Sequence, residues 1–255
     1  MSRSDILDAV QAAVTPLPWV QALWEGGSAS FGRADAWSDV DIGIAVEDAC
    51  VADGFAAAER ALDGLGPVAR RWVINPPGHA KPQRMYRFRE PEAPIVDLGV
   101  LPLRTRPEDR FVERRRHGSP RVLFDRCGFT ADTPPDPAAW RKRLRARLAD
   151  LDARVAFLGR YPVKAARRGD LPEAVSSYHS FVLRPLVEVL RIRHDPWRHD
   201  YDVRYLRHDL PEQARARLFP LWTVRDLGDL LARRDEAEAW FREEMAALDP
   251  DALAL

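Results

Sequence analysis

The sequence contains little cysteine, little lysine and no long hydrophobic run. The scarcity of cysteine and the lack of hydrophobic runs argue against disulfide-stabilised and membrane-spanning proteins. Cys50 and Cys127 are the only cysteines in 255 residues, so no disulfide framework is expected, although one bridge is left open. Lysine occurs only at positions 81, 142 and 164, so arginine carries nearly all of the positive charge. No apolar run reaches the roughly 20 residues that span a bilayer, and the first 19 residues are too polar for a signal peptide. We expect a soluble cytoplasmic protein with no membrane partner.

The chain also has no formal net charge at pH 7. The chain has 39 basic and 39 acidic residues, and this balance argues against a general nucleic-acid binder, though a local basic cleft is left open. Apolar residues make up 46 % of the chain, which is enough for a well-filled core in one large or two small domains.

Strand and helix patterns alternate up to about residue 130. A helix is expected over 5–14, with Ser4 as its N-cap, and an alanine-rich helix over 54–66 that ends in glycine. Alternating or β-branched segments predict strands over 20–28, 40–46, 68–75, 83–89, 94–102 and 121–125.

The pattern changes after the segment "TADTPPDP" at 130–137, whose prolines and aspartates are typical of a linker. Apolar residues spaced three and four apart predict a helix between Trp140 and Leu158. Further helices are expected over 171–194 with a bend at Pro185, within 209–221, and after a cap near Thr223. The expected fold class is α+β, with a mixed-sheet domain over 1–130 and an all-α helical bundle over 131–255.

The segment "GGSASFGRADAWSDVDIGIAV" at 26–46 carries the candidate chemistry. Asp39 and Asp41 are alternate residues, so they face the same side of a strand with Cα atoms about 6.6 Å apart. Two neighbouring carboxylates repel each other, and a hard cation such as Mg²⁺ relieves the repulsion. Gly27 allows unusual φ angles and close backbone approach, and Ser28 offers a hydroxyl and an N–H to an anionic oxygen.

A third acid, Asp97, lies in the middle of the expected strand "PIVDLGV", with Val96 and Leu98 pointing to the opposite face. On a strand next to the first two acids it could bind a second metal ion or act as a general base.

These residues resemble the nucleotidyltransferase superfamily typified by DNA polymerase beta: Gly-Ser, a ten-residue spacer, Asp-x-Asp, and a later strand acid. The resemblance is tighter to aminoglycoside adenylyltransferases, whose segment reads much like GSxxxGxxxxxSDxD. Here the matching residues are Gly27, Ser28, Gly32, Ser38, Asp39 and Asp41. The resemblance covers 20–46 specifically, extends to Asp97, and is only architectural over 131–255.

The resemblance implies transfer of AMP from ATP to a hydroxyl group, with release of pyrophosphate. Asp39 and Asp41 would bind Mg²⁺ and the nucleotide phosphates, and Asp97 would be a metal ligand, a general base, or both. Gly27 and Ser28 would hold the triphosphate, and Ser38 would assist them or cap the turn.

Two residues of the helical half are candidates without a motif. Glu173 is a candidate base, with a helix-dipole role in a first turn as the alternative. Lys164 is a candidate phosphate contact, with a solvated side chain as the alternative.

The segment 191–209 holds three histidines and several Arg and Asp residues. His194, His199 and His208 lack standard metal-ligand spacing, so we favour a structural loop with Arg–Asp pairs, with substrate contacts as the alternative. The Arg193-x5-His199 spacing also resembles the Arg-to-His spacing of HEPN ribonucleases. In an arginine-rich chain such a spacing arises easily by chance.

The acceptor is expected to be a hydroxylated small molecule, with an aminoglycoside-type antibiotic as the first guess. Protein or RNA acceptors, as in toxin–antitoxin systems, are one alternative, and neutral net charge counts against RNA. A nucleotide-binding module without catalysis is another, against which the three acids argue. The sequence does not reveal the oligomeric state.

Overall fold

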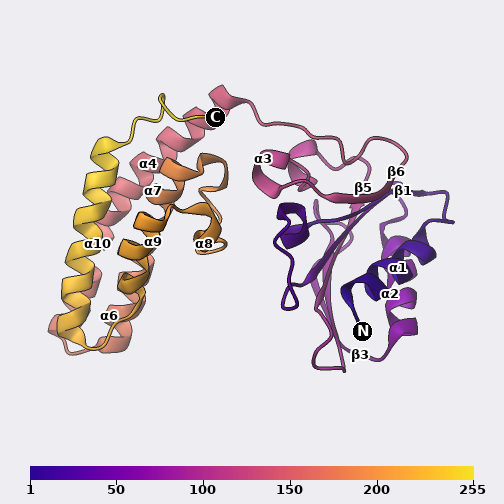
Figure 1. Ribbon diagram of the computed structural model, residues 1–255, viewed down its shortest axis with the longest axis horizontal. Coiled ribbons are helices and arrows are strands. Elements are labelled where there is room, and N and C mark those ends of the chain that lie inside the picture. The colour runs from indigo at the N-terminus through magenta and orange to yellow at the C-terminus, as the bar shows by residue number, and fades with distance from the viewer. The chain divides into compact units, whose positions relative to one another are not determined.

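Alternating and β-branched residues of the N-terminal half form one six-stranded mixed sheet (Figure 1). The structure is a computed structural model that describes residues 1–255. The strands are β1 (Val20–Glu25), β2 (Val40–Val46), β3 (Val68–Asn75), β4 (Gln83–Phe88), β5 (Val96–Pro102) and β6 (Arg121–Asp125). Their order in the sheet is β3-β4-β5-β2-β1-β6, and only the β2–β5 pair is parallel.

Two helices, α1 (Arg3–Val14) and α2 (Val51–Leu65), lie side by side against one face of the sheet (Figure 1). Their apolar residues form a core with alternate strand residues such as Val40, Ile42 and Leu98, all at most 3 % exposed. The period-2 alternation therefore sends Asp41 and Asp97 to the opposite face. On that face Trp24 packs so closely on Gly43 that an added Cβ would lie 2.2 Å from the indole ring.

Several expected boundaries in this half are corrected. The first helix is capped by Ser2 rather than Ser4, because Ser2 and Asp5 form a reciprocal capping box. The segment 20–28, expected as a strand running into a tight turn, is β1 up to Glu25, followed by a 3-10 helix at Gly27–Phe31. A short helix α3 (Arg114–His117) was not expected.

The C-terminal half is entirely helical and has its own core. Its helices are α4 (Pro137–Leu158), α5 (Tyr161–Arg167), α6 (Leu171–Tyr178), α7 (Arg184–His194), α8 (Leu206–Asp209), α9 (Glu212–Leu218) and α10 (Leu227–Ala247). The predicted stripe of α4 is buried, with Trp140, Leu144, Leu148, Leu151 and Val155 facing the core. The expected α+β class, a mixed sheet with helices followed by helices alone, is confirmed.

Three details of the helical half differ from expectation. The last helix is capped by Asp226 rather than near Thr223. The expected helix 171–194 is divided by a π-helical turn at His179–Leu183, directly before Pro185. Helix α5 was not expected, and its short length with Pro162 in the first turn explains the weak signal.

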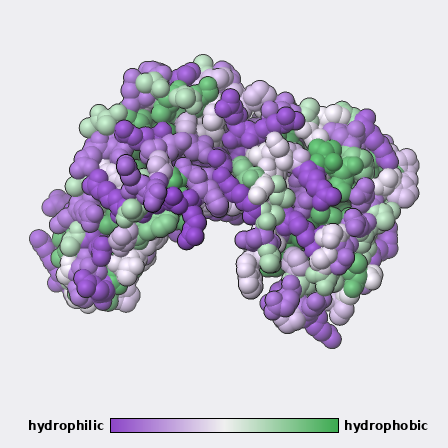
Figure 2. Space-filling model, in the orientation of Figure 1, coloured by the Kyte–Doolittle hydropathy of each residue, from purple (hydrophilic) through white to green (hydrophobic).

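The chain separates into two units, Met1–Pro135 and Asp136–Leu255. Hydrophilic residues cover most of the visible surface of each, with limited apolar areas (Figure 2). No helix combines the length and apolarity needed to cross a membrane. Cys50 and Cys127 are both free, so the disulfide that the sequence left open is absent.

Candidate active site

The pairing of β2 with β5 brings Asp41 and Asp97 together. The two strands are parallel, and Asp41 is the register partner of Asp97. Neighbouring strands lie about 4.8 Å apart. Both side chains project from the sheet face that α1 and α2 do not cover. Two of the three predicted acids are therefore direct neighbours across one strand pair.

The turn at Gly27 packs against the same carboxylate. Gly27 has a φ of +59°, and a Cβ added to it would lie 1.8 Å from Oδ2 of Asp41. The neighbouring Gly26 N–H donates to the carbonyl of Asp41 at 2.8 Å. Both reasons that the sequence suggested for glycine, unusual φ and close approach, are confirmed here.

Ser28, the next residue of the turn, has a buried hydroxyl without a hydrogen-bond partner. A buried unpaired hydroxyl costs about 1–3 kcal/mol, so such groups usually have a partner. An anionic oxygen bound at the turn would supply that partner. The glycine that contacts Asp41 and the residue with the unpaired hydroxyl are thus neighbours in one turn.

Asp39 and Ser38 lie just before β2. The side chain of Asp39 is exposed, and its carbonyl accepts a hydrogen bond from Arg3 Nη1 at 2.9 Å. Ser38 Oγ donates to Asp35 Oδ1 at 2.9 Å and accepts from the Asp35 N–H at 3.0 Å. The Ser38 bond, with the Trp37 N–H, holds the pKa of Asp35 below its usual value. Ser38 therefore closes the turn, the second of its two predicted roles.

Gln83 on β4 is a site residue that the sequence analysis missed. Its amide Nε2 donates to both carboxylate oxygens of Asp97, at 2.7 and 2.8 Å. The contact is diagonal across the β4–β5 pair, where Gln83 is opposite Gly99 and Met85 is opposite Asp97. A polar residue opening the strand 83–89 was the available signal, but the strand order that makes it meaningful is not local.

Arg3 and Glu25 were also missed. Glu25, the last residue of β1, is 2 % exposed and pairs with Arg3 Nε and, at 3.8 Å, with Arg121. The same Arg3 guanidinium holds the Asp39 carbonyl. One side chain of α1 therefore contacts both ends of the loop 26–39, which carries the Gly-Ser turn.

These residues fit a hard cation in their chemistry, but only in part in their placement. Carboxylate oxygens are the ligands that Mg²⁺ prefers, and Asp41, Asp97 and the unpaired Ser28 hydroxyl supply oxygen donors on one face. No group of three or more His, Cys, Asp or Glu side chains is gathered as a metal cluster. Asp39 is thus near the pair in sequence without being assembled with it.

The two remaining candidates, Lys164 and Glu173, belong to the helical unit. Lys164 is exposed on α5, with its Nζ 5.0 Å from the centre of the Tyr161 ring. Glu173 is exposed in the first turn of α6, whose cap Asp170 accepts from the Glu173 N–H at 3.0 Å. Both side chains are exposed, and their proposed roles stay predictions.

The segment 191–209 contains the Arg–Asp pairs that the sequence predicts. Arg191 is fully buried and pairs with Asp209 at 3.1 Å, and Arg198 pairs with Asp195. His199 Nδ1 instead lies 3.1 Å from Glu188, and Arg193 lies 2.8 Å from Glu244. The Arg193-x5-His199 spacing therefore joins two side chains that have different partners.

Comparisons with known proteins add little beyond this geometry. The sequence matches no protein-family model and no curated protein. Among solved structures, an aminoglycoside 6-adenyltransferase from Bacillus subtilis is 14 % identical, covering 97 % of this chain and 90 % of that chain with a TM-score of 0.35. A nucleotidyltransferase-like protein from Exiguobacterium sibiricum 255-15 is 10 % identical, covering 96 % and 75 % respectively, with a TM-score of 0.39. At these scores neither likeness assigns an activity to the chain.

Proposed function

We propose that this chain is a Mg²⁺-dependent nucleotidyltransferase that moves AMP from ATP to a hydroxyl group of a small molecule. The observation that carries the proposal is the pairing of Asp41 with Asp97 beside the Gly27–Ser28 turn. The Gly-Ser, Asp-x-Asp and strand-acid pattern of the sequence supports it. In this proposal residues 1–130 form the transferase domain and residues 131–255 a helical bundle.

The proposed reaction is a substitution at phosphorus. The acceptor oxygen forms a bond to the α-phosphorus of ATP, the bond from that phosphorus to the β-phosphate oxygen breaks, and pyrophosphate leaves. The acceptor proton passes to a carboxylate, for which Asp97 is the first candidate and Glu173 the second. Asp41 and Asp97 would hold Mg²⁺, and Asp39 would join them when the ion binds; the ion would supply positive charge that neutralises the phosphates.

The chain's own residues would position the reactants. The Ser28 hydroxyl and the Gly27–Ser28 backbone would bind phosphate oxygens, because the hydroxyl is buried without a partner. Gln83 would fix the orientation of Asp97 through its two hydrogen bonds. Ser38 would act indirectly by closing the turn with Asp35. Lys164 remains a proposed phosphate contact, and a cytoplasmic location remains a prediction.

The test measures pyrophosphate release from ATP and Mg²⁺ with labelled nucleotide and a panel of acceptors. The panel holds aminoglycosides, other hydroxylated small molecules, and protein and RNA from a cell extract. Label in a small molecule supports the proposal, whereas label only in protein or RNA assigns the acceptor to the alternative class. Absence of any transfer would leave a nucleotide-binding module and refute the enzymatic proposal.

Asp41→Asn is the decisive variant. It removes one charge at the strand pair, and we expect pyrophosphate release to fall about 100-fold or more. Asp63→Asn is the matched control, because Asp63 is an exposed aspartate on α2 that pairs with Arg71. Equal activity of the two variants would show that Asp41 has no role in the chemistry.

A further inference from the structure

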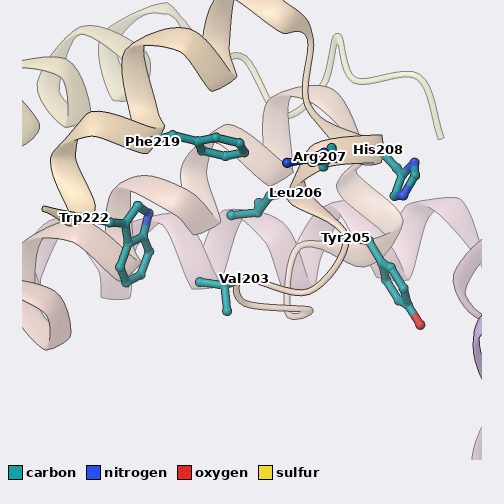
Figure 3. Close-up of a pocket in the computed structure, with 7 residues that line it drawn as sticks. All are labelled: Val203, Tyr205, Leu206, Arg207, His208, Phe219 and Trp222. Atoms are coloured by element: carbon teal, nitrogen blue, oxygen red, sulfur yellow. The ribbon is translucent and has the colours of Figure 1, made fainter. Parts of the chain in front are cut away.

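The helical unit contains a pocket of about 560 Å³ that the proposed chemistry does not use (Figure 3). Such a volume lies within the range of small-molecule sites, about 300–1,000 Å³. Its apolar lining comes from Val203, Tyr205, Leu206, Phe219 and Trp222. In Figure 3 Leu206 lies in the middle, between Trp222 on one side and Tyr205 and His208 on the other.

The pocket leaves apolar surface uncovered. Val203 is 42 % exposed and Phe219 is 40 % exposed, although neither is at a chain end. The rings of Phe219 and Trp222 flank Leu206, whereas the Tyr205 ring points away from it (Figure 3). Aromatic rings stack favourably on flat partners, so this composition suits a planar ring better than a flexible aliphatic chain.

The charge of the lining has one sign. Arg207 and His208 are its basic side chains, and none of the lining residues is acidic. Arg207 extends toward Phe219, whereas the His208 ring points away from Leu206 (Figure 3). A cationic ligand would be repelled here, whereas an anionic substituent on the ring would be attracted.

Hydrogen bonds from Arg191 hold the loop 202–205, which forms one wall of the pocket. The fully buried Arg191 donates from Nε to the carbonyl of Asp202 at 2.7 Å, and from Nη2 to the carbonyl of Arg204. Asp202 and Tyr205 have φ angles of +50° and +57°, which non-glycine residues rarely adopt. Such strain persists only where the surroundings hold it, and it clusters at ligand sites. The loop therefore presents Val203 and Tyr205 in one fixed arrangement.

The opposite wall is anchored as well. Tyr178 donates from its hydroxyl to the carbonyl of Leu221 at 3.0 Å, which fixes the short helix Phe219–Trp222. The His179 ring packs against Trp222, with centroids 5.1 Å apart, on the π-helical turn. Burial lowers the pKa of His179, and nearby Arg184 lowers it further, which favours a neutral ring there. Isolated π-helical turns are frequent at functional sites.

We propose that this pocket binds a planar aromatic group that carries a negative charge. Phe219 and Trp222 would stack on the ring, and Arg207 would face the anionic substituent. This inference goes beyond the proposed function, because binding at the pocket does not depend on nucleotidyl transfer.

The test uses three probes that distinguish the contribution of the aromatic ring to binding from the contribution of the negative charge. Isothermal titration calorimetry of the full chain compares 2-naphthalenesulfonate, 2-naphthylmethylamine and cyclohexanesulfonate. We expect the first, an aromatic anion, to bind about tenfold or more tightly than the aromatic cation or the non-aromatic anion. Equal binding of the sulfonate and the amine, or no binding of the sulfonate at millimolar concentration, would overturn the proposal.

Variants locate the binding. Phe219→Ser is expected to weaken sulfonate binding about tenfold, since a stacking surface is lost. Arg207→Ala is expected to weaken it about threefold, as for an exposed ion pair. Phe157→Ser and Arg204→Ala are matched controls, because Phe157 is 78 % exposed on α4 and Arg204 is exposed in the same loop, yet neither lines the pocket. Equal losses in the controls would refute the assignment.

A competition arm identifies the source of the aromatic anion. ATP is itself a planar base joined to phosphates, so displacement of the sulfonate by ATP would assign the pocket to the nucleotide. Failure of ATP to displace the sulfonate, when Phe219→Ser weakens sulfonate binding as expected, would assign the pocket to a second aromatic ligand. Both results support the proposed chemistry, and neither depends on pyrophosphate release.

Discussion

Gly27 shows how one residue shapes the candidate site. Its position next to Asp41 leaves no room for a side chain, and its φ of +59° lies where glycine has little competition. The hydroxyl of Ser28 is buried in the same turn. At this scale the site depends on the backbone as well as on its acids, since only glycine lets the turn approach the Asp41 carboxylate so closely.

The variant Gly27→Ala tests this reading. A Cβ placed 1.8 Å from Oδ2 of Asp41 must displace either the turn or the carboxylate, and the positive φ adds strain. We expect pyrophosphate release to fall about 100-fold, with a loss of about 1–2 kcal/mol in unfolding free energy. Steady-state kinetics and urea unfolding provide the measurements.

Gly64→Ala on α2 is the matched control, because nothing lies within 4 Å of a Cβ added there. It is expected to keep full activity and to gain stability slightly, as glycine is a poor helix former. An active Gly27→Ala variant would show that the close approach to Asp41 is unnecessary.

At the scale of elements, α1 is joined to the loop 26–39 by a single side chain. Arg3 pairs with the buried Glu25 at the start of the loop and with the Asp39 carbonyl at its end. A buried ion pair adds little net stability, because desolvation offsets much of the attraction. Its contribution here is positional: it fixes the two ends of a long loop that carries Gly27 and Ser28.

Arg3→Ala is therefore expected to loosen the loop more than the fold. Hydrogen exchange should show protection of the amides in 26–39 falling about tenfold, since local opening becomes easier. The kcat/KM for pyrophosphate release should fall about tenfold through misplacement of the turn. Protection in α4 and α10 should stay unchanged.

Arg126→Ala is the control for that experiment. Arg126 also binds backbone carbonyls next to β1, those of Thr15, Leu17 and Val20, but at the other end of the strand. It should lower stability without changing exchange at 26–39. Identical exchange profiles for the two arginine variants would contradict the positioning role of Arg3.

At the scale of the whole molecule, the two units have separate cores. The large core of the helical unit begins at Trp140, whereas the two cores around the sheet end at Phe129. No buried residue belongs to the cores of both units, and we expect each unit to unfold in its own transition. Within the helical unit, Glu188 on α7 joins α4 to the segment 191–209, because it accepts hydrogen bonds from Arg147 and contacts His199.

Glu188 makes the stability of the helical unit depend on pH. Burial alone would raise its pKa, but the bonds from Arg147 and His199 lower it from 4.5 to about 2. A depressed folded-state pKa stabilises the fold above pH 4.5, and the contribution of about 3 kcal/mol is lost as pH falls toward 2. Glu188→Gln should destabilise the helical unit at pH 7 and lack this part of the acid loss.

Calorimetry of the full chain between pH 7 and pH 3 measures the effect. We expect two transitions, of which Glu188→Gln shifts only one. Glu236→Gln, at an exposed position on α10, should leave both unchanged. Wild-type pH dependence in Glu188→Gln would show that this carboxylate does not control the acid loss.

The sequence by itself determined the local structure. The strands 40–46, 68–75 and 121–125 have the predicted bounds, because β-branched and alternating residues act over a few positions. Alternation also placed Asp41 and Asp97 away from the apolar core. Some errors lie at element ends, where Ser2 and Asp226 cap helices in place of the predicted residues, and others are the short helices α3 and α5, which were not expected.

Only the tertiary structure decided which of these residues meet. That Asp41 faces Asp97, that Gln83 binds Asp97, and that Arg3 reaches Asp39 all depend on strand order and helix docking. The pocket beside Trp222 depends in the same way on the buried Arg191. The physical reason is that hydrophobic periodicity is a local signal, whereas these contacts join segments far apart in the chain, whose pairing is set by packing of the whole unit.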